Sequence, residues 1–512
     1  MSNMAKRTSL SQKIKSLFSE ESKVKTMSFE FVEGAVDIFY VEAIIDKALF
    51  ASNVLLPIQK RLQSQNNQNK STENILKILK NEILAVPSIE EISDVEQIKF
   101  KILSGNVVVV SKENALLIPL FEVEKRSISE PPTTKVIKGP REGFVEDLMT
   151  NLGLVRKRLK TENLKIKDVF VGKQTHTQIS ICYLEKIAKP EIVEDVEKRL
   201  LSIDIDSVHD SYSVESFLEG NKLKFIRRVG NTEKPDVFCA KILEGRVGIL
   251  VDGSPIALTA PFVLFEDLQT AGDYSTIPPM VSFERIMRIC GLIFAILIPG
   301  IYVALQSYNY RILPINFLIS LLSSIEGLSI PPLIEILFVL LLFEVITEAS
   351  LQMPNSLAMA LSIIGALALG NTAVDAGIIS PPSIVVVAVS SVALYIIPDQ
   401  ISTTRLLRIL FTMIGGIIGL YGIVMSFVIL TTYLTSVKSF GVPFCMPYAP
   451  NIPEDKKDGF VKEDVQRMVT RPKLLAGKNK TRQKVKLKEN NLLLKTRKTS
   501  KKSTKKGEIY DK

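Results

Sequence analysis

The chain has 512 residues, 23% of them charged, and a mean hydropathy of +0.22. This hydropathy is high for a chain with so many charges, so apolar residues must be concentrated in one region. The four cysteines lie far apart without a CxxC pair and there are only two histidines, which argues against a disulfide framework and against a zinc or multi-histidine centre.

The N-terminal end lacks the features of a cleavable signal peptide. Its first 28 residues hold no apolar core of the length that such a peptide needs. We therefore predict a flexible N-terminal segment over residues 1–28, and we expect the hydrophilic region before Phe283 to stay in the cytoplasm.

The hydrophilic region contains an internal repeat. KILSGNVVVV, starting at Lys101, matches KILEGRVGIL, starting at Lys241, and upstream IFYVEAI matches ICYLEKI in the same order and at nearly the same offset. In each copy, alternating apolar runs predict strands, a helical stretch follows, and the KILxG unit supplies a hairpin. We predict two similar α/β lobes, over residues 29–138 and 139–270. A ligand or partner cleft between them and a duplicated scaffold remain equally open.

The stretch GPREGFVEDLMTNLGLVRKRLK, residues 139–160, lies between the lobes. Its apolar residues recur at helical spacing, and basic residues follow near the end where the helix dipole favours cations. Four residues here and in the VDGS turn of the second hairpin are candidates for contacts between lobes or with another subunit: Arg141, Glu142, Asp252 and Gly253. The alternative is a helix capped by charged residues, together with the tight turn that Asp-Gly favours.

The region from Ile286 to Pro450 holds only eleven Asp, Glu, Lys and Arg. Four uncharged runs are each long enough to cross a bilayer, which takes about 20 residues: Ile289–Tyr310, Ala349–Val374, Ala376–Pro398 and Ile409–Val437. We predict an α-helical polytopic membrane domain over residues 283–440, with an even number of spans so that both flanks are cytoplasmic. Four spans are predicted at Ile289–Tyr310, Leu333–Thr347, Ile378–Pro398 and Ile409–Val437. The shorter apolar stretches at Ile312–Ile325 and Leu357–Leu369 could be re-entrant or bring the count to six. Arg405 and Arg408 beside the last run argue instead for a cytoplasmic loop there, and the sequence does not resolve this conflict.

Four of the carboxylates in the apolar region are candidate ion-path residues. In a helix, Glu344 and Glu348 share one face and Glu335 is half a turn away, while Asp375 lies in NTAVDAG, where Gly and Asn weaken helix continuity. Our hypothesis is that an oligomer brings Glu344 and Glu348 into a ring that favours cations, with Asp375 and Glu335 as further candidates for the ion path. The alternative is that these acids lie at helix ends among the lipid headgroups.

The C-terminal end is strongly basic. We predict a membrane-exit segment over residues 441–470 and a disordered basic tail over residues 471–512, where sixteen Lys and Arg face three acids. The net charge of +10 therefore comes from the tail, and the rest of the chain is slightly acidic. Such a tail could attract anionic lipid or nucleic acid. A tail without a partner is the simpler interpretation, and we expect no nucleic acid as a partner.

Motifs for enzymatic work are absent from the sequence. It has no GxxxxGK phosphate loop, no GxGxxG after a strand, no GxSxG elbow and no HExxH. Asp204 and Asp206 could face one side of a strand, but without a third ligand they do not predict a metal site. We therefore predict that the chain is not an enzyme, with no catalytic, cofactor-binding or metal-binding residue and no cofactor.

Six motifs in order resemble the A subunit of the bacterial spore germination (nutrient germinant) receptor family. They lie within residues 29–472: GPREGFVEDLMTNLGLVRKRL, TEKPDV, LEGRVGILVDGSPIALTAP, IPGIYVAL, GNTAVDAGIISPP and SFGVPFCMPYAP. The resemblance implies a subunit of a complex in the inner membrane of dormant spores. Its expected partners are a permease-like B subunit, a lipoprotein C subunit, further copies of itself and the lipid bilayer.

The same resemblance implies that the complex senses nutrients and releases monovalent cations, with the A subunit oligomerising to form the ion path. Two other functions remain open. A secondary transporter would often show inverted repeats in its membrane region, whereas the repeat found here lies in the hydrophilic region. A non-conducting scaffold that signals to a separate channel would suit the membrane carboxylates and the paired lobes equally well.

Overall fold

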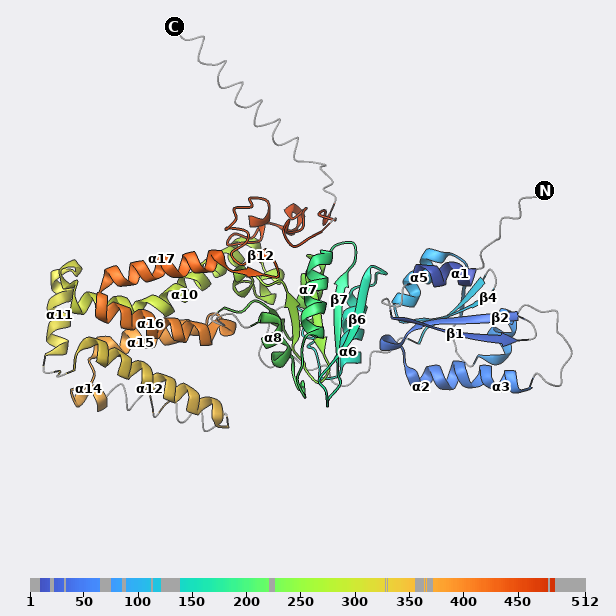
Figure 1. The fold of residues 1–512 in the computed structure, drawn as a ribbon, viewed down its shortest axis with the longest axis horizontal. Coiled ribbons are helices and arrows are strands. Elements are labelled where there is room, and N and C mark those ends of the chain that lie inside the picture. Colours follow the sequence, from blue (N-terminus) through green and yellow to red (C-terminus); the bar gives the residue numbers. More distant parts are fainter. Residues whose placement is uncertain are drawn as a thin grey trace, which may run out of the picture.

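An N-terminal α/β region and a C-terminal helical region lie end to end in the molecule (Figure 1). The computed structural model describes residues 10–18, 23–31, 34–64, 75–84, 89–111, 114–120, 139–220, 226–326, 328, 330–354, 363, 365, 372–477 and 479–483. Three predicted segments therefore fall wholly or mostly outside the described residues: the end of the first lobe, the short apolar stretch at 357–369, and the tail beyond residue 483.

The first sheet has five antiparallel strands in the order β1-β2-β4-β5-β3. In that order the strands are β1 (Val24–Phe31), β2 (Gly34–Val41), β4 (Val107–Ser111), β5 (Asn114–Ile118) and β3 (Glu90–Ile92). Helices α1 (Leu10–Leu17) and α5 (Val95–Leu103) cover one face. The other face is covered by α2 (Lys47–Phe50), the turn Ala51–Leu55, α3 (Leu56–Ser64), α4 (Ile75–Ile78) and Leu79–Ile83.

The second sheet repeats this topology, in the order β6-β7-β9-β10-β8. Its strands are β6 (Leu164–Val171), β7 (Thr177–Leu184), β9 (Val247–Val251), β10 (Ala257–Ala260) and β8 (Gly230–Thr232). Helices α6 (Leu148–Arg158) and α9 (Pro235–Leu243) cover one face, and α7 (Pro190–Leu201) and α8 (Ser211–Glu219) cover the other. In both sheets the KIL motif ends a helix that leads directly into a central hairpin.

Alternation along the strands explains why both faces of each sheet are covered. Ile38 points to the helices α2–α4, whereas its neighbour Phe39 points to α1 and α5, and both are buried. The second hairpin turns at Gly253, whose φ of +81° is in the region that glycine adopts without strain. The sequence therefore predicts these hairpins correctly from local pattern alone.

The N-terminal segment is more ordered than the sequence predicts. Leu10 and Ile14 on α1 are buried against the first sheet, and β1 already begins at Val24. The prediction of a flexible segment through residue 28 is therefore wrong over these parts, because the amphipathic LSQKIKSL buries its apolar side on the sheet.

The helical region is built from six longer helices within the described residues. They are α10 (Pro278–Ser307), α11 (Ile315–Ile325), α12 (Pro332–Gln352), α15 (Pro381–Leu394), α16 (Ile401–Ile418) and α17 (Leu420–Ser436), with the short α14 at Ala373–Asp375. By length and composition, two helices in the described part could cross a membrane, Pro278–Ser307 and Pro398–Ile418. Helix α10 packs against both α15 and α16.

The last uncharged run is two helices rather than one. Gly419 separates α16 from α17 with a φ of +76°, and the chain turns back so that the two helices pack together. A Cβ at this glycine would lie 3.3 Å from Tyr308 of α10, so a larger residue has little room. The prediction of a single span over Ile409–Val437 is wrong for this reason, and Arg405 and Arg408 lie within α16 instead of in a loop.

After α17, the chain returns to the second sheet. Phe440, Val442 and Leu475 belong to the same buried core as β7 and β9, and the Gly477 amide donates to the Ile187 carbonyl at 2.7 Å. The prediction of a disordered tail from residue 471 is therefore wrong for residues 471–477. Two leucines next to a small Ala-Gly pair were the signal in the sequence, and the surrounding lysines concealed it.

Candidate functional site

A cavity of about 330 Å³ lies between the two sheets. Its charged lining residues are four cations and two carboxylates: Lys23, Lys25, Lys47, Arg156, Glu42 and Asp168. Two of the cations are already paired in place, Lys47 with Glu42 at 3.2 Å and Lys23 with Asp168. The surplus positive charge favours a small anionic group over a cation in this cavity.

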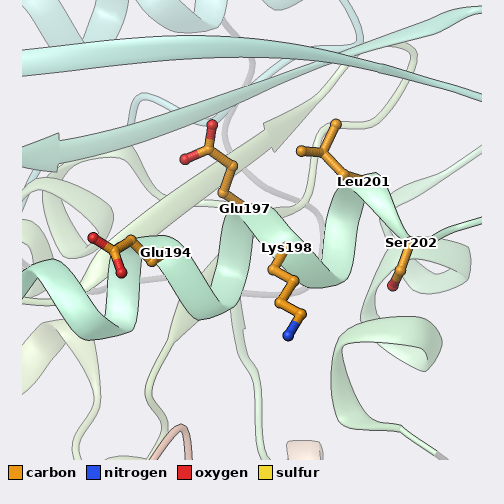
Figure 2. A pocket seen from close by; sticks show the side chains of 5 residues that line it. All are labelled: Glu194, Glu197, Lys198, Leu201 and Ser202. Atoms are coloured by element: carbon orange, nitrogen blue, oxygen red, sulfur yellow. The ribbon is translucent and has the colours of Figure 1, made fainter.

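A second pocket runs along α7 alone. Figure 2 shows its lining side chains, which come from α7 and from the residue that follows it: Glu194, Glu197, Lys198, Leu201 and Ser202. Glu197 is engaged with Lys167 of β6 at 3.2 Å. A pocket formed by one helix brings together no convergent set of polar groups, so we assign it no chemistry.

The predicted contact residues between the lobes turn inward to the second sheet. Glu142 pairs with Lys157 at 2.9 Å and with Arg158, and both of these basic residues lie at the end of α6. The Asp252 carboxylate accepts from the Leu148 amide at 3.3 Å, and the Gly253 amide donates to the Glu146 carbonyl. These contacts secure the start of α6 on the hairpin, and Arg141 is exposed nearby.

Other residues connect the two sheets. A Cβ at Gly153 of α6 would lie 2.6 Å from the Ala43 carbonyl, so the helix approaches the first sheet closely only because this position is glycine. Lys99 forms an ion pair with Glu162, and Lys23 forms one with Asp168. A glycine within an apolar helical run was the signal for this approach, and Gly153 was not among the predicted contact residues.

In the helical region, Glu335 is buried at the start of α12. Its Oε1 accepts from the Ser380 amide and from the Ser380 hydroxyl, each at 2.7 Å, and that hydroxyl also contacts Ser383. Because Ser380 directly precedes α15, the carboxylate caps the N-terminal end of that helix. Glu335 therefore connects α12 to α15.

Glu344 is paired with two arginines of α16. Its Oε1 accepts from Arg408 Nη2 at 2.6 Å, and Arg405 Nε lies 3.2 Å from its other oxygen. The Arg408 side chain is 1% exposed and also donates to Ser390 and Ser391 of α15. We call Glu344, Ser390, Ser391, Arg405 and Arg408 the Arg408 cluster.

The Arg408 cluster connects four helices. Ser390 donates in turn to the Ala295 carbonyl of α10 at 2.8 Å, so α10, α12, α15 and α16 meet at this point. One carboxylate facing two guanidinium groups has a net charge of +1, which does not favour a cation. The charge around Glu344 is thus the opposite of what a cation-selective ring needs.

The two remaining carboxylates are exposed. Glu348 lies one turn beyond Glu344 on α12 and accepts from Gln352 at 3.3 Å, and Asp375 is the last residue of α14. The four predicted ion-path acids therefore divide into two pairs. Glu335, which is buried, and Glu344, which is partly buried, are hydrogen-bonded between helices, whereas Glu348 and Asp375 are exposed. Within the described residues, no three His, Cys, Asp or Glu side chains converge as a metal site would require.

A cluster around the buried Asp273 and Arg285, which was not predicted from the sequence, lies where α10 begins. Asp273 receives Arg285 Nε at 2.9 Å and Arg288 Nη2 at 2.9 Å, while Arg285 Nη1 donates to Asp458 at 2.9 Å. Arg285 has no exposed side-chain surface. Burial by itself would raise the pKa of Asp273, but hydrogen bonds from the arginines and Thr270 hold it below the ordinary value. We call Asp273, Arg285, Arg288 and Asp458 the Asp273 cluster.

Known proteins resemble this chain over most of its length. The family model described as Bacillus/Clostridium GerA spore germination protein matches residues 12–474. The chain is 31% identical to the uncharacterized membrane protein YfkQ of Bacillus subtilis (strain 168), with 88% of each chain covered. It is also 31% identical to spore germination protein GerLA of Bacillus cereus, covering 84% of this chain and 88% of that protein. Spore germination protein KA of B. subtilis is 29% identical, with 87% and 82% covered.

Among solved structures, the chain is similar to the N-terminal domain of the A subunit of the Bacillus megaterium spore germinant receptor GerK3. That match has a TM-score of 0.37 and 24% identity, and it covers 50% of this chain and 97% of the other. The sequence matches are the stronger finding, because they extend through both sheets and the helical region. The chain therefore belongs to the Bacillus/Clostridium GerA spore germination protein family.

Proposed function

We propose that this chain is the A subunit of a nutrient-sensing germination receptor in the spore inner membrane, where copies of it assemble around a nutrient-gated cation path. The observation that carries the proposal is the family match over residues 12–474, which includes both sheets and the helical region. Two helices long and apolar enough for a bilayer support the membrane placement. A permease-like B subunit and a lipoprotein C subunit are the proposed partners.

The geometry favours Glu348 and Asp375 over Glu344 as groups that meet a moving cation. Both are exposed in the single chain, so a neighbouring copy could bring them into a common water-filled path. An exposed carboxylate beside apolar helix surface is costly in lipid unless water or protein surrounds it. Glu344 and Glu335 hold helices together in this proposal, and they need not face the path.

The experiment is potassium efflux from cells that make this chain with its partner subunits, with and without nutrient. Glu348→Gln removes one exposed charge without breaking an ion pair, and Glu326→Gln is the matched control on an exposed carboxylate that follows α11. We expect Glu348→Gln to reduce nutrient-dependent efflux several-fold or to alter ion preference at equal protein level. The control should behave as the unaltered chain.

Three results would redirect the proposal. Efflux unchanged by both Glu348→Gln and Asp375→Asn would remove the carboxylates from the cation path. No nutrient-dependent efflux from a verified, assembled complex would favour the non-conducting scaffold, which predicts effects of these substitutions on assembly alone. Coupled solute uptake in place of efflux would favour a secondary transporter.

A further inference from the structure

The segment that connects α15 to α16 is held by the second sheet. Gln400, the last residue before α16, donates from its side-chain amide to Asp267, which lies in the linker between the second sheet and α10. Arg227 donates to the other oxygen of Asp267 at 2.9 Å and to Asn231 of β8 at 3.0 Å. We call Arg227, Asp267 and Gln400 the Asp267 bridge.

The Asp267 bridge is buried and charge-assisted, which makes it a firm attachment. The Asp267 side chain is 4% exposed, and the Arg227 guanidinium also lies over the Phe262 ring at 4.9 Å. Asp399, beside Gln400, adds a longer contact of 3.8 Å to the same guanidinium. Removing either donor from a buried carboxylate costs free energy, because the carboxylate is left short of a hydrogen bond. The segment 398–400 should therefore follow any movement of this part of the second sheet.

Helix α16 starts at the next residue and carries the two arginines of the Arg408 cluster. At 1.5 Å per residue, Arg405 and Arg408 lie roughly 7 and 12 Å along the helix from Gln400. Between these points the helix has no Pro or Gly that would let it bend. Displacement of Gln400 therefore moves the two arginines, and they hold Glu344 of α12 directly.

We propose that α16 transmits movements of the second sheet to α12, with the Asp267 bridge at one end and the Arg408 cluster at the other. Asp267, Gln400 and Arg408 are positioning residues in this scheme, because each acts by holding another group. The use of this link in germination rests on the proposed function, whereas the mechanical link itself does not. Helices tied together through polar groups in a packed core shift as units, which makes such a link physically reasonable.

The test is hydrogen–deuterium exchange on the full chain in lipid nanodiscs. Asp267→Asn weakens the bridge while keeping side-chain shape, and Asp37→Asn is the control in the first sheet, where Asp37 pairs with Lys15 at 3.3 Å. We expect Asp267→Asn to speed amide exchange several-fold both in residues 401–408 and around Glu344 on α12. The control should affect exchange in the first sheet alone.

A second variant keeps the proposal testable if Asp267→Asn does not fold. Gln400→Ala leaves the Arg227–Asp267 pair intact and should give the same pattern with a smaller amplitude. If either variant folds and exchange rises at residues 399–400 but not on α12, the proposal is overturned. Hydrogen exchange does not require ion flow, so the two proposals can fail separately. Coupled exchange without ion efflux would refute the proposed function and leave the link through α16 standing. Ion efflux without coupled exchange would refute the link and leave the proposed function standing.

Discussion

The two five-stranded sheets have the same strand order but different relations to the rest of the chain. The buried cores on both faces of the first sheet come from residues between Leu10 and Leu120. The core of the second sheet also contains Phe440, Val442, Met446 and Leu475 from beyond the helical region. The two sheets thus share a topology, but the first has a self-contained core, whereas the core of the second is complete only when the C-terminal segment packs on it.

This difference indicates which parts of the molecule should unfold together. Unfolding the second sheet must release the C-terminal segment, and with it Asp458 of the Asp273 cluster at the start of α10. The first sheet makes no comparable demand. Its described contacts with the second unit include the close approach at Gly153, the packing of Ala43 beside it, a Lys160–Phe100 contact and a few ion pairs, but no chain segment that completes its core. We expect the first sheet to open independently and the second to open together with the helix junction.

The largest expected effect comes from the Asp273 cluster. Arg285→Met should lower the stability of the full chain by about 3–5 kcal/mol, because it removes a cation from the buried Asp273 and from the partly exposed Asp458. Thermal unfolding in detergent, followed by protease access to residues 441–477, measures the loss. Lys15→Met breaks the exposed pair with Asp37 in the first sheet and should cost less than about 1 kcal/mol. Equal effects of the two changes would remove the distinction between the sheets.

The next largest effect should come from a cavity made in the core of each unit, because the two cavities should affect different parts of the chain. Leu475→Ala and Leu116→Ala each truncate a fully buried leucine, at an expected cost of about 2–5 kcal/mol. Hydrogen exchange should report Leu116→Ala in the first sheet only. Leu475→Ala should raise exchange in the second sheet and in residues 438–446 together. Confinement of the Leu475→Ala effect to the C-terminal segment would contradict a shared core.

The smallest expected effect depends on pH. Burial on α8 raises the pKa of Glu215 to about 7, with Arg227 opposing the shift. Between its ordinary pKa and pH 7 the folded chain binds this proton more tightly than the unfolded chain, so stability falls as the pH rises. Glu215→Gln should stabilise the chain by about 1–2 kcal/mol at pH 8 and change little at pH 5. Melting temperatures at the two values measure this, and a parallel gain at both would contradict it. Asp267, whose burial raises its pKa to about 6, is unchanged in this variant and supplies a residual slope.

Local pattern was sufficient for much of the fold. The KILxG motifs predicted both central hairpins because strand alternation and the Asp-Gly turn act over a few residues. Pairing of the edge strands β3 and β8 could not be predicted, since each is three residues long and joins its sheet across an intervening helix. The prediction of a single last span failed because Gly419 resembles any other glycine in an apolar run until Tyr308 is seen beside it.

For the carboxylates of the helical region, too, part of the arrangement follows from local sequence and part from tertiary structure. Helical spacing by itself placed Glu344 and Glu348 on one side of α12 and Glu335 on another, since that spacing follows from 3.6 residues per turn. Only the tertiary structure decided that Arg408, 64 residues later, neutralises Glu344 while Glu348 stays exposed. Which charges meet depends on how the helices pack. The apolar residues that drive this packing do not specify which residue pairs with a carboxylate between two helices. The sequence determined the elements and the family, and folding in three dimensions determined which acids support the helices and which stay exposed.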